Sequence, residues 1–343
     1  MDFQRALHDW YRINHRKLPW REAPSLYRTV VSEFMLQQTQ VATVLPYFER
    51  WHRELPDFAA LAAATEAKVI KLWEGLGYYS RARNLHKLAR AVVALPTLPR
   101  SVAEWIELPG IGPYTAAAIA SISLGQPAAC VDGNVVRILA RLTNDGLLFR
   151  DSSTAAKYFT PLADQLIIGG HPGTHNQAMM ELGATICVRA KPQCLVCPVA
   201  AFCVARKKGE PEKIPRFQPK QIEQRSVARV WCEHRGRLLL KRGHAAAKRL
   251  AGLYELPDFK DFNSPTPMKE SLIAVKRRTI TRFQITESIH RISPSADLLK
   301  ETKAHETMEW VRLDDIAKLT LSGPHKRWIA EFLPTRIGDQ LKN

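Results

Sequence analysis

The sequence predicts a multi-domain protein in which an all-α domain is followed by a smaller α+β domain. Three observations predict this fold class. Apolar residues recur at helical spacing through most of the first 200 residues. The stretch 205–224, ARKKGEPEKIPRFQPKQIEQ, is rich in lysine, proline and glutamine, which is typical of a linker. Segments at 226–233 and 271–292 then read as strands. We therefore expect domains at 1–203 and 225–343, joined by a linker at 204–224.

The charge of the chain favours a polyanionic partner. Lysine and arginine total 50 against 33 acidic residues, which gives a net charge of +17. No apolar run approaches the ~20 residues that a membrane-spanning helix needs. The start of the chain, MDFQRALHDWYR, is charged and does not resemble a signal peptide. We expect a monomer that binds nucleic acid and no membrane, in the cytoplasm (associated with the nucleoid if the source is bacterial).

The stretch LPGIGPYTAAAI at 108–119 predicts two helices joined by a glycine hairpin. Ser101, with Glu104 three residues later, is a capping-box start for the first of these helices. Gly110 and Gly112 tolerate positive φ, and the neighbouring prolines cannot continue a helix. The hairpin would leave backbone N–H groups free at a helix N-terminus to bind a phosphate. A helix-hairpin-helix of this kind grips a DNA backbone without reading its sequence.

Asp132 stands at the beginning of the next predicted helix, ahead of the apolar stripe Val135, Ile138, Leu139 and Leu142. One interpretation is an ordinary N-cap, which needs no further function. The other is a carboxylate that the helix N-terminus keeps ionised, so that it faces a cation formed during a reaction.

Glu33 lies within the predicted helix Leu26–Gln38, among apolar neighbours. Such a glutamate commonly points to solvent on the opposite face of the helix. If it points instead into a dry cleft, loss of hydration raises its pKa and leaves it protonated as an acid. The segment alone does not choose between these two positions.

Two further stretches carry side chains suited to contacts with bases. Gln37–Gln40 is an uncharged polar run whose amides can bond base edges, although an exposed helix end would look the same. Gly75–Arg81 is a glycine turn that combines two tyrosines with arginine, which suits insertion into a base stack. Packing of the tyrosines in the core is the alternative.

Four cysteines within 17 residues indicate a metal centre: Cys187, Cys194, Cys197 and Cys203. Disulfides are the alternative, but they are rare in a reducing compartment. Four thiolates at this spacing suit zinc, and they suit a [4Fe–4S] cluster equally well. Cys130 and Cys232 are left over and are expected to be ordinary buried residues.

Several motifs together resemble the MutY family of adenine DNA glycosylases. They are SEFMLQQTQV (32–41), GLGYYSRARNL (75–85), LPGIGPYTAAAI (108–119), VDGNVVR (131–137), NQAMMELGA (176–184) and the four cysteines. In the second domain, GLYELPDF (252–259) and WVRLDDIAKLTLSGPHKR (310–327) are similar to the MutT/Nudix-like domain of that family.

The resemblance implies base excision repair of double-stranded DNA, with removal of adenine opposite 8-oxoguanine or guanine. It assigns a [4Fe–4S] cluster to the four cysteines of the loop 187–203. Glu33 matches the catalytic acid that protonates adenine at N7. Asp132 matches the carboxylate that stabilises the oxocarbenium ion or forms a transient covalent adduct. One protonated and one ionised carboxylate are also what the chemistry of glycoside cleavage requires.

The resemblance extends to further site residues. Tyr114 and Asn134 match positions beside the two catalytic carboxylates. The adenine pocket is assigned to Trp20, Arg21, Leu36 and Glu181. DNA binding is assigned to Gln38, Tyr78, Arg81, Gly110 and Gly112, of which Gln38 and Tyr78 match residues that insert around the oxidised guanine.

Two alternative functions are distinguished by single positions. Endonuclease III carries a lysine where this chain has Tyr114, and that amine forms the Schiff base that leads to strand cleavage. A tyrosine cannot form this imine, so we expect a monofunctional glycosylase rather than a glycosylase/lyase. A non-catalytic DNA-binding scaffold with a structural metal would need neither Glu33 nor Asp132.

The second domain departs from the family pattern in two places. Nothing after Gly252 resembles the glutamate-rich pyrophosphatase signature, so nucleotide hydrolysis is not expected. Where the family usually has Phe-Ser-His to read 8-oxoguanine, this chain has Ile280-Thr281-Arg282. Thr281 retains a hydroxyl group, whereas Arg282 is larger and permanently charged. We therefore expect weaker discrimination between 8-oxoguanine and guanine than is usual.

Overall fold

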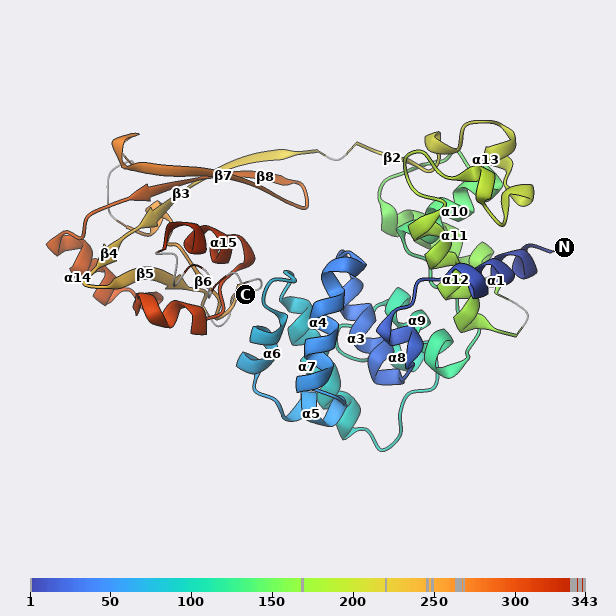
Figure 1. Ribbon diagram of the computed structural model, residues 1–343, viewed down its shortest axis with the longest axis horizontal. Coiled ribbons are helices and arrows are strands. Elements are labelled where there is room, and N and C mark those ends of the chain that lie inside the picture. The colour runs from blue at the N-terminus through green and yellow to red at the C-terminus, as the bar shows by residue number, and fades with distance from the viewer. Residues whose placement is uncertain are drawn as a thin grey trace. The chain divides into compact units, whose positions relative to one another are not determined.

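The chain forms two compact units in the computed structural model (Figure 1). The structure describes residues 2–167, 170–219, 221–244, 247, 250–262, 267, 269–333, 338 and 341. Unit 1 consists of Met1–Ala64 and Asn84–Pro219, and unit 2 consists of Thr65–Arg83 and Lys220–Asn343. The segment 65–83 is therefore contained in the first half of the sequence but packs with the second half.

Unit 1 is helical, as the sequence predicts for the first domain. Its helices are α1 (Phe3–Asn14), α2 (Pro19–Glu22), α3 (Leu26–Leu36), α4 (Val41–Glu54), α5 (Phe58–Ala63), α8 (Val102–Ile106), α9 (Pro113–Leu124), α10 (Gly133–Thr143), α11 (Ser152–Leu166), α12 (Pro172–Thr185) and α13 (Val204–Lys207). Helix α7 (Ser80–Ala94) begins in unit 2 and continues into unit 1. The short strands β1 (Leu148–Phe149) and β2 (Arg216–Phe217) pair in parallel.

Capping side chains determine where several of these helices begin. Ser101 and Glu104 form the predicted capping box at α8, and Asp132 is confirmed as the N-cap of α10. Helix α5 ends at Ala63 and a separate helix, α6 (Glu66–Trp73), follows it, because the backbone of Ala64 is extended and Thr65 caps the new helix. Ordinary N-cap chemistry accounts for this break.

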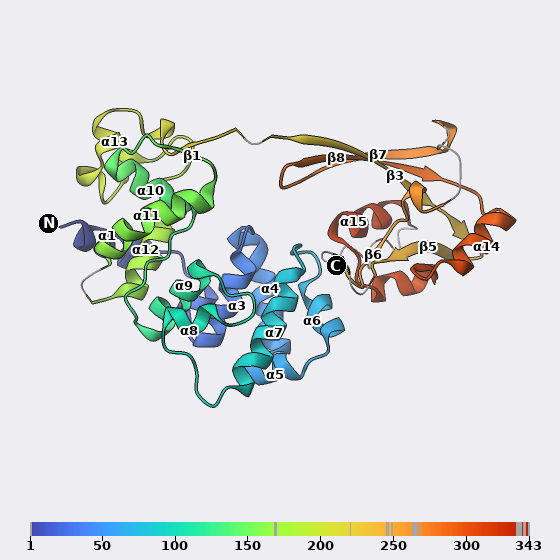
Figure 2. The ribbon, with the colours of Figure 1, turned by 180° about the vertical axis from the view of Figure 1, so that it is seen from behind.

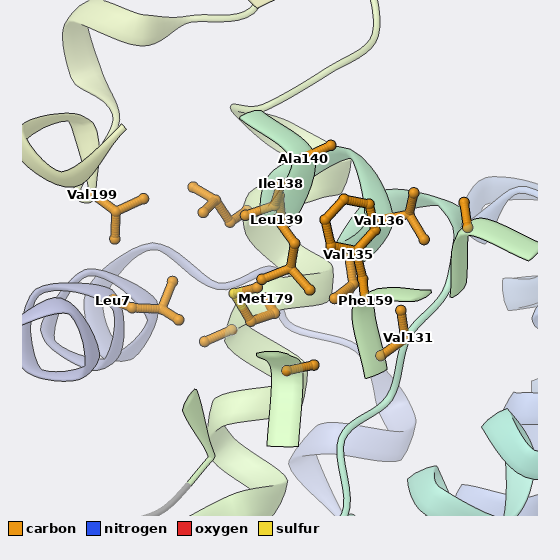
Figure 3. Packing of buried hydrophobic residues seen from close by; sticks show 14 of the residues in the cluster. Leu7, Val131, Val135, Val136, Ile138, Leu139, Ala140, Phe159, Met179 and Val199 are labelled. Carbon is orange, nitrogen blue, oxygen red and sulfur yellow. The ribbon is translucent and has the colours of Figure 1, made fainter. Parts of the chain in front are cut away.

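The core of unit 1 surrounds α10 (Figure 3). The apolar stripe of this helix includes Val135, Ile138 and Leu139, all nearly fully buried. It packs in one cluster with Leu7 of α1, Phe159 of α11, Met179 of α12 and Val199 of the cysteine loop. This packing holds the N-terminus of α10, and with it Asp132, in a fixed place.

Two glycines let α12 approach its neighbours closely. A Cβ atom on Gly183 would lie 2.6 Å from the Cβ atom of Asn134, and one on Gly173 would lie 2.8 Å from the carbonyl oxygen of Ser121. Either contact is closer than real Cβ atoms come to another atom. These positions therefore require glycine for packing against α10 and α9.

Unit 2 contains two sheets (Figure 2). The first is formed by β3 (Glu223–Trp231), β8 (Phe283–Arg291) and β7 (Leu272–Ile280), in which β8 is parallel to β3 and antiparallel to β7. The second is formed by β4 (Glu233–His234), β5 (Arg237–Arg242), β6 (Tyr254–Glu255) and β9 (Met308–Arg312). Helices α14 (Ala296–Ala304) and α15 (Gly323–Phe332) complete the unit.

Helix α15 contributes Trp328 and Ile329 to a core that also contains Trp231 and Ile289 of the first sheet and Leu238 of the second. The strand predicted at 226–233 corresponds to β3, and the region predicted at 271–292 corresponds to β7 and β8. Leu313–Lys318 forms a 3-10 helix.

The segment 65–83 joins unit 2 through buried polar contacts. One carboxylate oxygen of Glu74, a residue that is 7% exposed, accepts a hydrogen bond of 2.8 Å from the backbone N–H of Leu321. The Tyr79 hydroxyl donates to the carbonyl oxygen of Leu321 at 3.1 Å. The Lys71 ammonium group donates to the carbonyl oxygens of Ala317 and Leu319.

The expected linker 204–224 is partly ordered. It contains α13, a 3-10 turn at Pro211–Lys213 and strand β2 in unit 1, and the beginning of β3 in unit 2. The boundary between the units lies at 219/220. Within the described part of the chain, no helix has the length and apolarity to span a membrane.

Candidate active site

Unit 1 contains a cleft of about 1100 Å³ that brings together residues far apart in the sequence. One wall comes from α2, α3 and the turn after α3, and the other from α9, α10 and α12. The sequence-predicted residues that line it are Trp20, Arg21, Glu33, Leu36, Gln38, Tyr114, Asp132, Asn134 and Glu181. The proposed acid, the proposed carboxylate and the proposed base pocket thus share one cavity.

Glu33 is buried, so the solvent-exposed alternative is wrong. Its side chain comes from the middle of α3, and the residue is 8% exposed. Burial raises the pKa of Glu33 to about 7, and the nearby charge of Asp132 acts in the same direction. A hydrogen bond with Tyr114 and the charge of Arg21 oppose the rise. Near neutral pH this carboxyl group therefore holds a proton that it can donate.

Asp132 is surrounded by N–H donors. One carboxylate oxygen accepts hydrogen bonds from the backbone N–H groups of Asn134 at 2.9 Å and Val135 at 2.8 Å. The other accepts from Asn134 Nδ2 at 2.9 Å. Burial is the largest effect and raises the pKa of Asp132 above its ordinary value, although these donors and the charge of Arg137 act in the lowering direction. The sequence prediction included only the lowering effect of the helix N-terminus, because burial of this carboxylate cannot be read from its own segment.

Both oxygens of Asp132 act as acceptors, which is the arrangement that suits an ionised carboxylate. Glu33 accepts no backbone N–H in the described structure, and its only side-chain hydrogen-bond contribution comes from Tyr114. The two acids therefore have different surroundings, and Glu33 is the better proton donor of the two.

Tyr114 lies in the first turn of α9 and faces both acids. Burial raises the pKa of Tyr114 well above its ordinary value, and the charges of Glu33 and Asp132 add to the effect. The hydroxyl lies 3.6 Å from the Met180 sulfur and is hydrogen-bonded to Glu33. The hydroxyl donates to the sulfur of Met180, and its hydrogen bond with Glu33 lowers the pKa of that acid. Tyr114 is thus a neutral group that orients the acid.

Asn134 connects Asp132 to the cysteine loop. Its side-chain amide donates to Asp132, while its carbonyl oxygen accepts a hydrogen bond of 2.9 Å from the Arg137 guanidinium group. Arg137 also donates to the carbonyl oxygens of Gly183 at 2.8 Å and Cys187 at 2.7 Å. Asn134 therefore fixes the orientation of the carboxylate. The motif VDGNVVR contains Arg137, but only the folded chain reveals its contacts.

Glu181 anchors the opposite wall of the cleft. It is fully buried and forms ion pairs with Arg16 at 2.7 Å and Arg21 at 2.9 Å. Burial raises the pKa of Glu181, but the two arginines outweigh this effect and hold the pKa below its ordinary value. Arg16 lies in the coil after α1, and it is not among the predicted site residues because no local pattern predicts a partner 165 residues away.

The remaining pocket residues supply apolar surface. Trp20 is partly buried and packs edge to face on Phe48, with ring centroids 5.0 Å apart. Leu36 is the last residue of α3 and is also partly buried. A flat apolar wall beside a buried carboxylate and two guanidinium groups suits a planar heterocycle that carries hydrogen-bonding groups.

The residues predicted to bind DNA are divided between the two units. Gln38, in the turn after α3, is exposed with a φ of 56°, and it lines the cleft of unit 1. Tyr78 is 47% exposed with a φ of 47° and belongs to unit 2. Both residues have an exposed side chain and a left-handed backbone conformation, which is uncommon for residues other than glycine.

Arg81 does not fit its predicted role. It is only 7% exposed, and its guanidinium group donates to the carbonyl oxygens of Leu76 and Gly77. The same group lies over the rings of Trp73 and Tyr78, at 5.3 and 5.6 Å from their centroids. Arg81 thus stabilises the turn that presents Tyr78, and the prediction of a direct DNA contact is wrong.

The glycine hairpin is present, but only one of its glycines has positive φ. Gly110 has a φ of 76°, and a Cβ atom there would lie 2.5 Å from the Cβ atom of Asn84. Gly112 is the N-cap of α9 with a φ of −104°, so the tolerance of glycine for positive φ is used at Gly110 and not at Gly112. Gly112 has no capping side chain, and a Cβ atom there would meet nothing within 4 Å.

The four loop cysteines line one small pocket with Arg141 and Arg206. All four are free thiols, so no disulfide joins them. Arg141 donates to the Cys187 sulfur at 3.3 Å and to the carbonyl oxygens of Val188 and Arg189. Within the described residues, no group of three or more His, Cys, Asp or Glu side chains is arranged around a single metal ion. The convergent thiols and the cationic donor nevertheless fit an anionic thiolate-bound group. Cys130 and Cys232 are buried, as expected.

In unit 2, Thr281 and Arg282 form the two-residue turn between β7 and β8. Thr281 has a φ of 53°. The side chain of Arg282 is 60% exposed, pairs with Glu223 at 2.8 Å and lies over the Phe283 ring. The tripeptide Ile280-Thr281-Arg282 therefore reaches the tip of a hairpin.

Comparison with known proteins identifies the family. A family model described as HhH-GPD superfamily base excision DNA repair protein matches residues 31–146. The adenine DNA glycosylase of Buchnera aphidicola subsp. Acyrthosiphon pisum (strain APS) is 34% identical over 282 residues, which are 81% of this chain and 78% of that protein. The chain belongs to the adenine DNA glycosylases.

The human adenine DNA glycosylase is 44% identical to this member of the family over 224 residues. The match covers 62% of this chain but only 41% of the human protein, so the chain spans about two fifths of that relative. Among solved structures, a thermostable thymine-DNA glycosylase is 26% identical with a TM-score of 0.54. The likeness covers 60% of the present chain and 95% of that chain.

Proposed function

We propose that this chain removes adenine from duplex DNA in which the adenine is paired with 8-oxoguanine or guanine. One observation carries the proposal: Glu33 and Asp132 line a single cleft, and their surroundings favour opposite protonation states. The names of the relatives support adenine as the base. A non-catalytic scaffold would need neither carboxylate.

In the proposed reaction, an adenine extruded from the duplex enters the pocket beside Trp20, Arg21 and Glu181. Glu33 donates its proton to N7 of the base, which turns adenine into a good leaving group. The bond between C1′ and N9 then breaks, and its electron pair leaves with the base. Asp132 stabilises the resulting oxocarbenium ion until water adds to C1′ and gives a proton to the carboxylate of Glu33, which restores the acid. The products are free adenine and an abasic site.

We propose a monofunctional glycosylase. A β-lyase needs an amine that attacks C1′, and lysine is absent from the described residues that line the cleft. Tyr114 stands beside both acids but has no amine. Duplexes with adenine opposite 8-oxoguanine, guanine and cytosine test the reaction, with products resolved before and after alkali. We expect strand breaks only after alkali. A borohydride-trapped adduct at stoichiometric yield would instead establish lyase chemistry.

The excision rate is expected to fall as pH rises through about 7. Burial raises the pKa of Glu33 to about 7, so the proton to be donated is present below this pH and lost above it. Above pH 7 the single-turnover rate constant should decrease about tenfold per unit. At low pH it should fall again as Asp132 becomes protonated. Duplex affinity measured across the same range is the control, and a flat profile between pH 6 and 9 would contradict the role of Glu33.

We propose that the loop cysteines Cys187, Cys194, Cys197 and Cys203 hold a [4Fe–4S] cluster. This group would contribute a rigid fold to the loop rather than chemistry at the base, and Arg141 would offset its negative charge. Purified protein should be brown and contain iron and acid-labile sulfide. Cys197→Ser should lose the colour, with Cys130→Ser as the matched control that retains it. Colourless protein with one zinc per chain would contradict the cluster.

We propose that unit 2 is a MutT-like domain whose β7–β8 hairpin contacts the base opposite adenine. The support is the position of Thr281 and Arg282 at the exposed tip. Arg282 stands where the family pattern has a histidine. The excision rate opposite 8-oxoguanine should therefore exceed the rate opposite guanine by a smaller factor than is usual for this family. Thr281→Ala should reduce the ratio further, whereas Thr307→Ala, far along the sequence from the tip, should not. An unchanged ratio in Thr281→Ala would mean that the hydroxyl group of Thr281 does not take part in recognition of the opposite base.

We propose that the active form is a monomer, because one chain supplies both carboxylates and the residues around them.

A further inference from the structure

The coil that leads into Asp132 depends on side chains from elsewhere for its position. Residues 125–132 form neither helix nor strand, so no helical or sheet ladder fixes them. Asp132 itself has an extended backbone, with φ −96° and ψ −176°. The location of the carboxylate relative to Glu33 and Tyr114 is therefore set on one side by α10, which Asp132 caps, and on the other side by whatever anchors the residues just before it.

Asp164 of α11 accepts the backbone N–H of Ala129 at 3.1 Å in an exposed contact, and Asn176 of α12 provides the buried anchor. Its side-chain oxygen accepts a hydrogen bond of 2.9 Å from the backbone N–H of Cys130. Its side-chain nitrogen donates to the carbonyl oxygen of Ala128 at 2.8 Å and to the hydroxyl of Ser121 at 2.8 Å. Because the N–H of Cys130 can only donate and the carbonyl of Ala128 can only accept, the orientation of the amide is settled by its partners.

This position has a specific chemical requirement. Asn176 is 2% exposed, and its amide pairs with the coil on both sides of Ala129 as a neighbouring β-strand would. Aspartate lacks the two donors, and alanine would leave buried backbone groups of Ala128 and Cys130 without these partners. An asparagine amide is the group that satisfies all three partners.

The same amide connects three elements that contribute residues to the cleft, namely the coil before Asp132, α9 and α12. Ser121 belongs to α9, which carries Tyr114 in its first turn, and Asn176 belongs to α12, which carries Glu181. Cys130 packs against Ala117 and Ala118 of α9, with Tyr114 beside them. A shift of the coil would thus move Asp132 relative to Tyr114 and Glu181, because α9 and α12 would stay in place.

We propose that Asn176 is a positioning residue for the reaction and acts through Asp132. It touches neither base nor sugar in the proposed reaction, since it does not line the cleft. Its contribution is to hold the carboxylate at the distance from the sugar at which a developing positive charge is best stabilised. This inference rests on the proposed adenine excision.

The test compares Asn176→Ala with Ser121→Ala. The serine variant removes one bond of the same amide but leaves both backbone anchors, so it is the matched control. We expect the single-turnover excision rate of Asn176→Ala to fall about 100-fold, the size of effect that a 1 Å displacement causes. Ser121→Ala should remain within threefold of the wild type. Both are measured well below the midpoint of thermal unfolding of each variant.

A second measurement separates positioning from a general loss of stability. Asp132 should bind a duplex with a cationic pyrrolidine at the abasic position more tightly than one with neutral tetrahydrofuran. In Asn176→Ala the ratio of the affinities for the cationic and the neutral duplex should fall by at least about tenfold. The affinity for the neutral duplex, and the pH near 7 at which the excision rate begins to fall, should stay unchanged. If Asn176→Ala does not fold, Asn176→Ser is used for both measurements.

A folded Asn176 variant with the rate and cation preference of the wild type would overturn the inference. So would an equal loss in Ser121→Ala, because the backbone anchors are intact there. Absence of adenine excision by the wild-type chain would instead refute the proposed function. The two failures are therefore distinguishable.

Discussion

Asp132→Asn is expected to abolish adenine release while leaving affinity for the duplex within about tenfold, or roughly 1.4 kcal/mol. Asparagine keeps the size of the side chain and is as good an N-cap as aspartate, so α10 should still begin at the same residue. It lacks the negative charge that would face the sugar cation. Loss of one preorganised group of this kind costs about 10³-fold or more in the chemical step.

The measurement is single-turnover excision at saturating enzyme, with duplex affinity determined on an uncleavable adenosine analogue. Asp151→Asn is the matched control, because Asp151 is also an N-cap, at α11, but lies on the surface. It should excise adenine at the rate of the wild type. Equal excision by Asp132→Asn would mean that this residue is only a helix cap and that another group stabilises the cation.

Glu33→Gln is expected to reduce excision by about 10²-fold to 10⁴-fold, since glutamine cannot donate a proton to the base. The same variant should be more stable than the wild type at pH above 7. In the unfolded chain Glu33 ionises near pH 4.5, whereas burial raises its pKa in the folded chain to about 7. The native state is therefore penalised as pH rises from 4.5 to 7, and the penalty reaches about 3 kcal/mol.

Glutamine removes this penalty and keeps the volume of the side chain. The gain in the free energy of unfolding should be small at pH 5 and largest above pH 7. Glu22→Gln, at an exposed residue of α2, is the control and should change neither stability nor excision. A Glu33→Gln protein that is less stable than the wild type at pH 8 would show that the ionised carboxylate stabilises the fold.

Local patterns predicted the parts of the structure that depend on local interactions. The capping box at Ser101 and the N-cap role of Asp132 follow from the side-chain chemistry of adjacent residues. The apolar stripe of α10 likewise predicted which face is buried. These features need no knowledge of distant partners.

The surroundings of a side chain could not be predicted in the same way. The segment around Glu33 left its direction open, because burial comes from the elements that pack on α3. Arg81 lies in a basic cluster and was wrongly expected at the surface, since the carbonyl groups that bind it belong to the fold of the turn. Arg16 and Asn176 have partners at long sequence separation, and no periodicity marks such pairs.

The packing at Gly183 leaves no room for a larger side chain next to Asn134. Its missing side chain leaves room for Asn134, which in turn orients the carboxylate of Asp132. Replacement by alanine would raise helix propensity and alter neither charge nor polarity, so by the usual measures of similarity it is a mild change. The added methyl group would nevertheless occupy space already filled by Asn134. The proposed activity can thus be lost through one added carbon atom at the wall of the cleft.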